Sequence, residues 1–187
     1  MKLDKNNTWP YALTWVGAAG LAVAFALFSP TESRVMGHFP AFMSRTLTNQ
    51  PVTAPGGLPA DRTLTLITFH RSQRAQADSW IQGLNLNNDS SITWLRMPVF
   101  NDPGTPQFRD AAENRLLQHY PAPGERSRLV PVFTDRANFV RSAGLTGIDQ
   151  SSVVIVNRHG EVLARVQGEF DAVKAQTLRE TLKAQGL

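Results

Sequence analysis

Beyond residue 61, short apolar runs alternate with segments in which apolar residues recur at helical spacing. The β-branched and apolar runs predict five strands, at residues 63–69, 92–99, 129–134, 152–156 and 161–167. The helical spacing predicts helices at 72–84, 107–119 and 136–143 and one after Asp171. We expect Gly144 to end the third of these helices and Asp171 to cap the last.

The predicted order of elements is β-α-β-α-β-α-β-β-α. Crossover helices favour parallel neighbours, whereas a tight turn ending at Gly160 joins the last two strands as an antiparallel hairpin. The expected fold class is therefore α/β, with a mixed sheet flanked by helices. We expect the last helix to turn Val173, Leu178 and Leu182 toward the sheet. The other expected core side chains are Phe69, Trp80, Trp94, Leu129, Val132 and Val154.

The N-terminal part of the chain has a different pattern, because no charged residue occurs from Asn6 to Thr31. Residues 9–29 are long enough to cross a hydrocarbon layer of about 30 Å as a helix. We expect a short tail at 1–8 followed by one transmembrane helix, with a cleaved secretory signal as the alternative. With Lys2 and Lys5 on the cytoplasmic side, the domain faces the periplasm or another extracytoplasmic side, at the inner membrane if the source is bacterial.

Residues 30–61 are rich in proline and glycine and predict a linker to a domain at 62–187. A short amphipathic turn within this linker is expected to pack either on the membrane or on the domain. Its apolar residues are Met36, Phe39, Phe42 and Met43.

Composition excludes several classes of function. The 187 residues include no cysteine, which rules out disulfides, thiolate catalysis and cysteine-ligated metals. The four histidines lack the spacing of a metal motif, so neither a metal nor another cofactor is expected. The net charge of +4 is scattered without a basic run, so nucleic acid is not an expected partner.

Three segments resemble parts of the thioredoxin-like superfamily, especially its peroxiredoxin and membrane-tethered thiol-oxidoreductase branches. They are LITFHRSQRAQADSW (66–80), LVPVFTDRANFVRSAGLTG (129–147) and VVIVNRHGEVLARVQG (153–168), the last resembling the terminal hairpin. Members of the superfamily carry their redox cysteines after the first strand and commonly a cis-proline before the fourth. Those places here hold residues 70–75 and Gln150-Ser151, so the resemblance implies a thioredoxin-like fold without its redox site.

A shorter similarity concerns the loop and helix after the first strand. Phe69, Arg71, Gln76 and Ser79-Trp80 resemble this region in a mitochondrial ATP synthase assembly factor family of thioredoxin-like fold. This resemblance implies an assembly chaperone at a membrane and not an oxidoreductase.

A candidate binding site follows the carboxyl end of the first predicted strand, where open α/β sheets commonly bind ligands. One hypothesis is an anion or peptide-carboxylate site formed by Arg71, Arg74 and the helix amides, with His70 nearby. The other is a solvated loop. Asp110 and Glu113 share a helical face, but no complementary group is predicted beside them, so we expect no catalytic residue.

The leading functional prediction is a membrane-anchored, non-catalytic interaction or assembly factor that holds a protein partner in a membrane complex. Pairing of a partner segment with a sheet edge is one physical route to binding. The alternatives are an enzyme that uses non-thiol chemistry on this scaffold and a structural subunit of a secretion or conjugation apparatus.

Overall fold

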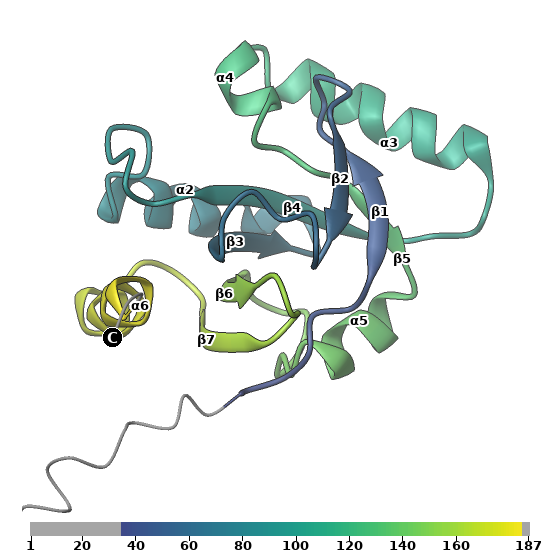
Figure 1. Ribbon diagram of the computed structural model, residues 1–187. Coiled ribbons are helices and arrows are strands. Elements are labelled where there is room, and N and C mark those ends of the chain that lie inside the picture. Colours follow the sequence, from purple (N-terminus) through teal and green to yellow (C-terminus); the bar gives the residue numbers. More distant parts are fainter. Residues whose placement is uncertain (1–34, 185–187) are drawn as a thin grey trace, which may run out of the picture. The chain divides into compact units, whose positions relative to one another are not determined.

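A five-stranded mixed sheet forms the centre of the fold in the computed structural model, which describes residues 35–184 (Figure 1). In spatial order the strands are β5 (Val132–Thr134), β4 (Trp94–Asn101), β3 (Arg62–Thr68), β6 (Ser152–Asn157) and β7 (Val162–Gln167). β4 pairs in parallel with both β3 and β5, whereas β6 pairs antiparallel with β3 and β7. The predicted α/β class with a mixed sheet is confirmed.

One face of the sheet packs against α2 (Arg74–Gly83) and α6 (Ala172–Lys183). Trp80 of α2 is fully buried there, and its indole N–H donates to the Gly168 carbonyl at 2.8 Å. The prediction for Val173 is wrong, because this side chain is 79 % exposed. α6 instead buries Ala175, two residues and therefore about 200° further round the helix.

The opposite face is covered by α5 (Arg136–Ser142) and by a hairpin of β1 (Phe42–Arg45) and β2 (Pro51–Ala54). The hairpin and its flanks bury four apolar side chains in this core: Phe39, Val52, Ala54 and Leu58. The structure therefore differs from the linker predicted at 30–61, since the domain already includes the hairpin. Its proline and glycine residues resemble a linker in sequence, yet Pro51 opens a strand, where proline is tolerated.

Residues 36–39 form an N-terminal strap along the start of β7. Met36 donates to the Val162 carbonyl at 2.8 Å, and the Val162 N–H donates to Gly37 at 2.9 Å. The strap also lies against the end of α5, where Gly144 has a φ of +66°. A Cβ at Gly144 would collide with the Met36 carbonyl, so this glycine both ends the helix, as predicted, and admits the strap.

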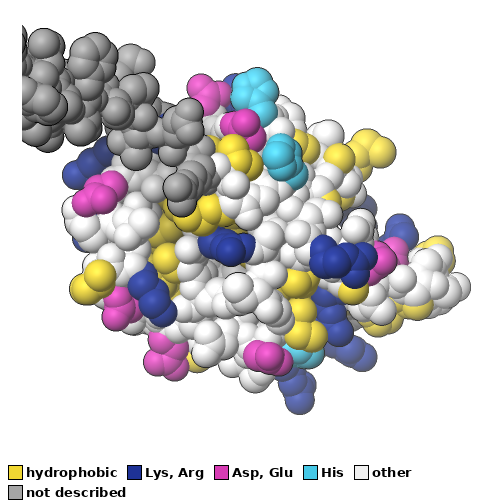
Figure 2. All heavy atoms as spheres, turned by 90° about the horizontal axis from the view of Figure 1, so that it is seen from below, with side chains coloured by type: hydrophobic (Ala, Val, Ile, Leu, Met, Phe, Trp, Pro, Cys, Tyr) yellow, Lys and Arg dark blue, Asp and Glu magenta, His cyan; other side chains and the backbone are white. Residues whose placement is uncertain are grey.

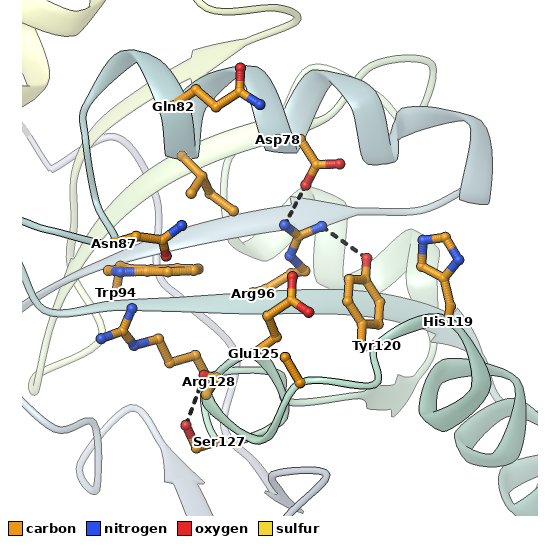
Figure 3. A pocket seen from close by; sticks show the side chains of 13 residues that line it. Asp78, Gln82, Asn87, Trp94, Arg96, His119, Tyr120, Glu125, Ser127 and Arg128 are labelled. Atoms are coloured by element: carbon orange, nitrogen blue, oxygen red, sulfur yellow. Dashed lines mark hydrogen bonds and ion pairs between the residues drawn. The ribbon is translucent and has the colours of Figure 1, made fainter.

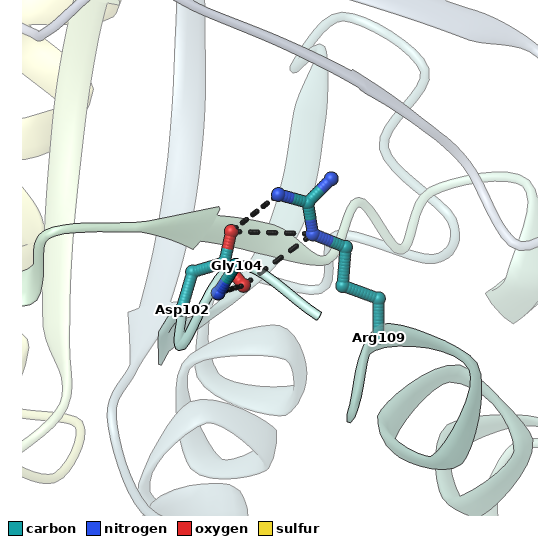
Figure 4. Close-up of polar contacts among 3 residues, drawn as sticks. All are labelled: Asp102, Gly104 and Arg109. Atoms are coloured by element: carbon teal, nitrogen blue, oxygen red, sulfur yellow. Dashed lines mark hydrogen bonds and ion pairs between the residues drawn. The ribbon is translucent and has the colours of Figure 1, made fainter. Parts of the chain in front are cut away.

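Two helices connect β4 to β5, namely α3 (Pro106–His119) and the short α4 (Pro123–Arg126), which lie together on one side of the fold (Figure 1). Asp102, just beyond β4, fixes the turn into α3 (Figure 4). Its carboxylate accepts the Gly104 N–H at 3.0 Å and Arg109 Nη2 at 2.5 Å. These bonds, that of Arg109 first, hold the pKa of Asp102 below its ordinary value of 3.8.

Within residues 35–184, no helix has both the length and the apolar character needed to cross a membrane. The predicted tail at 1–8 and transmembrane anchor at 9–29 lie outside the described residues.

Candidate functional site

The loop after β3 lies where thioredoxin-like proteins carry their redox motif. A 3-10 turn, η1 (Arg71–Gln73), leads directly from this loop into α2. His70 and Arg71 are exposed and Arg74 is half-buried, and all three line one small pocket of about 60 Å³. The structure therefore brings the three predicted site residues together, while anion binding by them stays a prediction.

Gln73 closes this loop from the inside. Its side chain is 3 % exposed, and its Oε1 accepts the backbone N–H groups of Phe69 at 2.7 Å and His70 at 3.3 Å. Its Nε2 donates to the Ile148 carbonyl at 2.6 Å. One side chain thus completes the hydrogen bonds of the turn into α2 and connects this turn to the segment before β6.

Gln76 makes a second connection to the same segment. Its Oε1 accepts the Ser151 N–H at 2.8 Å. A proline here, as the thioredoxin-like superfamily commonly has, would have no N–H to donate. We call Gln73, Gln76 and their bonds to Ile148 and Ser151 the glutamine bridge. It occupies the place of the redox site with neutral amides, which have no thiol chemistry.

A second polar cluster surrounds Arg96 in the middle of β4. Its side chain is 8 % exposed and donates to Asp78 Oδ1 on α2 at 2.5 Å and to the Tyr120 hydroxyl at 2.8 Å. The Cζ atoms of Arg96 and Arg74 lie 5.0 Å and 5.7 Å from the centroid of the Tyr120 ring. A buried guanidinium requires such pairing, because an unpaired charge inside a protein is costly.

A larger pocket of about 620 Å³ borders this cluster, with α2 above it and the α4 region below it in Figure 3. Asp78 extends from α2 toward Arg96, and Arg128 stacks on Trp94 with its Cζ 4.9 Å from the ring centroid (Figure 3). Arg96 and Tyr120 line both this pocket and the small one beside His70. We call the two pockets together the arginine groove.

Sequence reasoning singled out none of Arg96, Tyr120 and Gln73, and it named Gln76 only as part of a family resemblance. Arg96 had one signal, since it is the only charged residue in the apolar strand predicted at 92–99. The bonds of Gln73 to Ile148 and of Gln76 to Ser151 had none, because each joins residues that lie 75 positions apart along the chain.

Of the two acidic residues weighed as a catalytic pair, Glu113 pairs with Arg45 of β1 at 2.8 Å, whereas no ion pair among residues 35–184 includes Asp110. Among residues 35–184, no three His, Asp or Glu side chains are grouped closely enough to hold a metal ion.

No protein-family model and no curated protein matches the sequence of this chain. Solved structures do match its fold. A candidate electron transport protein from Aquifex aeolicus VF5 superposes with a TM-score of 0.57 at 10 % identity, covering 81 % of this chain and 99 % of its own.

Two further solved structures are a thiol:disulfide interchange protein from Bacteroides sp. and an exposed lipoprotein thioredoxin from Streptococcus pneumoniae. The first has a TM-score of 0.51 at 14 % identity and covers 80 % of this chain and 91 % of its own. The second has a TM-score of 0.50 at 7 % identity, with 76 % and 98 % covered. These likenesses and the strand order show that the chain has a thioredoxin-like fold, which it combines with a sequence free of cysteine.

Proposed function

We propose that this protein is a membrane-anchored thioredoxin-like assembly factor that binds a partner protein without thiol chemistry. The observation that carries the proposal is the glutamine bridge at the place of the redox site. It joins the two segments that present the reactive groups in thiol oxidoreductases of this fold, and it does so with side chains that can neither be oxidised to a disulfide nor act as a nucleophile.

The positive charge of Arg71 and Arg74, next to the glutamine bridge, supports a role in binding for the loop after β3. None of the ion pairs among residues 35–184 includes Arg71 or Arg74. Two guanidinium groups without a carboxylate partner, next to a rigidly bonded turn, suit recognition of an anionic group on another molecule.

The sheet edge at β5 is an unsuitable alternative for the partner. Leu129 already accepts the Leu47 N–H at 3.0 Å, and the Pro131 carbonyl accepts the Ser44 hydroxyl at 2.5 Å. Pro131 itself has no N–H to offer to an added strand. The hairpin therefore occupies this edge, which favours the loop after β3 as the binding surface.

Affinity purification of the full chain from its native membrane in a mild detergent tests the proposal. We expect wild-type protein to retain a defined membrane complex, and Arg71→Ala/Arg74→Ala to lose most of it. The matched control is Arg136→Ala/Arg141→Ala, which removes the same charge from α5. Equal recovery with both double variants contradicts the proposal, as does insulin reduction or peroxide consumption above background.

A further inference from the structure

We infer that the arginine groove binds an acidic segment of a partner polypeptide, whose carboxylates lie along Arg74, Tyr120 and Arg128. This inference rests on the proposed function, because it names the chemistry of the partner. It extends the binding surface from the loop after β3 into the larger pocket beside Trp94.

Unpaired positive side chains outnumber unpaired negative ones along the groove. Arg96 uses Asp78, but none of the ion pairs among the described residues includes Arg71, Arg74 or Arg128. Glu125 is the other acidic residue in the lining. Three guanidinium groups therefore face one free carboxylate, and an added carboxylate improves this balance.

The hydroxyl of Tyr120 supplies an independent observation. The residue is 6 % exposed, and its oxygen accepts a hydrogen bond from Arg96 at 2.8 Å. Among residues 35–184 this hydroxyl donates no hydrogen bond, so its own hydrogen is available to the groove. A phenol that accepts from a guanidinium is polarised as a donor, and a carboxylate oxygen is its best acceptor.

The remaining lining suits a polypeptide. The amides of Gln82 and Asn87 at the far end match the donors and acceptors of a peptide backbone. A volume of about 620 Å³ suits a few residues of extended chain and not a folded domain.

The face shown in Figure 2, which is the underside of the view in Figure 1, provides the contrast. Asp and Glu side chains are interspersed with Lys and Arg over much of this face, although the basic side chains gather toward its right side in the view. Binding driven only by the overall charge of +4 would not distinguish this face from the groove. A point variant on each surface can therefore separate specific from general attraction.

Fluorescence anisotropy with fluorescein-labelled hexaglutamate and hexaglutamine tests the inference on the full chain in detergent. We expect hexaglutamate to bind about tenfold tighter at fixed ionic strength, since charge-assisted bonds are the stronger ones. Arg128→Gln and Tyr120→Phe should each weaken its binding by about threefold or more, and the exposed control Arg141→Gln by much less. Thermal melting of each variant verifies that it is folded.

Three results overturn the inference. The first is equal binding of the two peptides, and the second is that Arg141→Gln weakens binding as much as the groove variants do. The third is that inorganic phosphate displaces hexaglutamate at a far lower concentration than acetate does. The last would make the groove a phosphate site. If these results occur while Arg71→Ala/Arg74→Ala still releases the membrane complex, the proposed function stands and only the acidic partner is wrong.

Discussion

Two polar regions flank the start of α2, and they differ in how their hydrogen bonds are completed. The glutamine bridge is neutral and largely buried, and Gln73 uses both ends of its amide on backbone groups. The arginine groove is charged and open, and Tyr120 keeps a hydrogen to donate. The comparison teaches that hydrogen bonds hold the segments at the place of thiol chemistry together, while the adjacent charged side chains remain available to a ligand.

Removal of Gln73 should break this contrast most strongly. Gln73→Leu leaves two backbone N–H groups and one carbonyl without their partner, which we expect to lower the free energy of unfolding by about 3 kcal/mol. Urea denaturation measures the change. Gln82→Leu, at an exposed position of α2, should lower this free energy by only about 0.5 kcal/mol. Similar losses for both variants would show that the bridge does not stabilise the fold.

The second half of the bridge should contribute less, because Gln76 is half-buried and makes one bond. We expect Gln76→Leu to cost about 1–2 kcal/mol by leaving the Ser151 N–H unpaired. Gln76→Glu keeps an oxygen in place to accept that N–H and should recover most of the loss. Denaturation of both variants distinguishes the hydrogen bond from simple packing, which would make the two equally destabilising.

Arg128 in the groove should contribute less to the free energy of unfolding than Gln73 in the bridge. Arg128→Gln removes the stacking on Trp94, for which we expect about 0.5–1 kcal/mol. Arg128→Lys retains a cation over the ring, so its free energy of unfolding should lie between those of wild type and Arg128→Gln. A loss as large as that of Gln73→Leu, measured in the same denaturant series, would contradict the distinction between the two regions.

The smallest effect is expected at Asp102, outside both regions, and it should depend on pH. The fold lowers the pKa of this carboxyl below 3.8, chiefly through Arg109, so its stabilisation is present above about pH 4 and is lost as the pH falls through the lowered value. The difference in Tm between wild type and Asp102→Asn should be steady from pH 7 to about pH 5 and shrink below about pH 4. A difference that stays constant to pH 2.5 would remove the ion pair as its cause.

The sequence was most informative where the structural cause is local. β-branched runs gave β3 and β6, Gly160 gave the turn between β6 and β7, and Asp171 gave the cap of α6, where it accepts two backbone N–H groups. Each of these depends on residues a few positions apart, whose preferences act before any distant contact forms.

Parts of the molecule that depend on distant contacts could not be predicted in this way. The β1–β2 hairpin is stable because Phe39 and Leu58 pack into the core, not because its short strands have a strong pattern. Position in a family motif indicated His70, Arg71 and Arg74, but it could not reveal that Arg96 joins Asp78 to Tyr120. The one feature of the sequence that indicated this cluster was a single arginine in an otherwise apolar strand.

The N-terminal strap determines how mechanical tension enters the domain. A pull applied ahead of residue 35 acts first on Met36 and Gly37, whose bonds to Val162 connect it to the outer strand of the sheet. His38 and Phe39 add bonds to Ser142 and Gly160, both at 2.7 Å. Force from that end therefore acts on β7 and on the end of α5 before it reaches the hairpin.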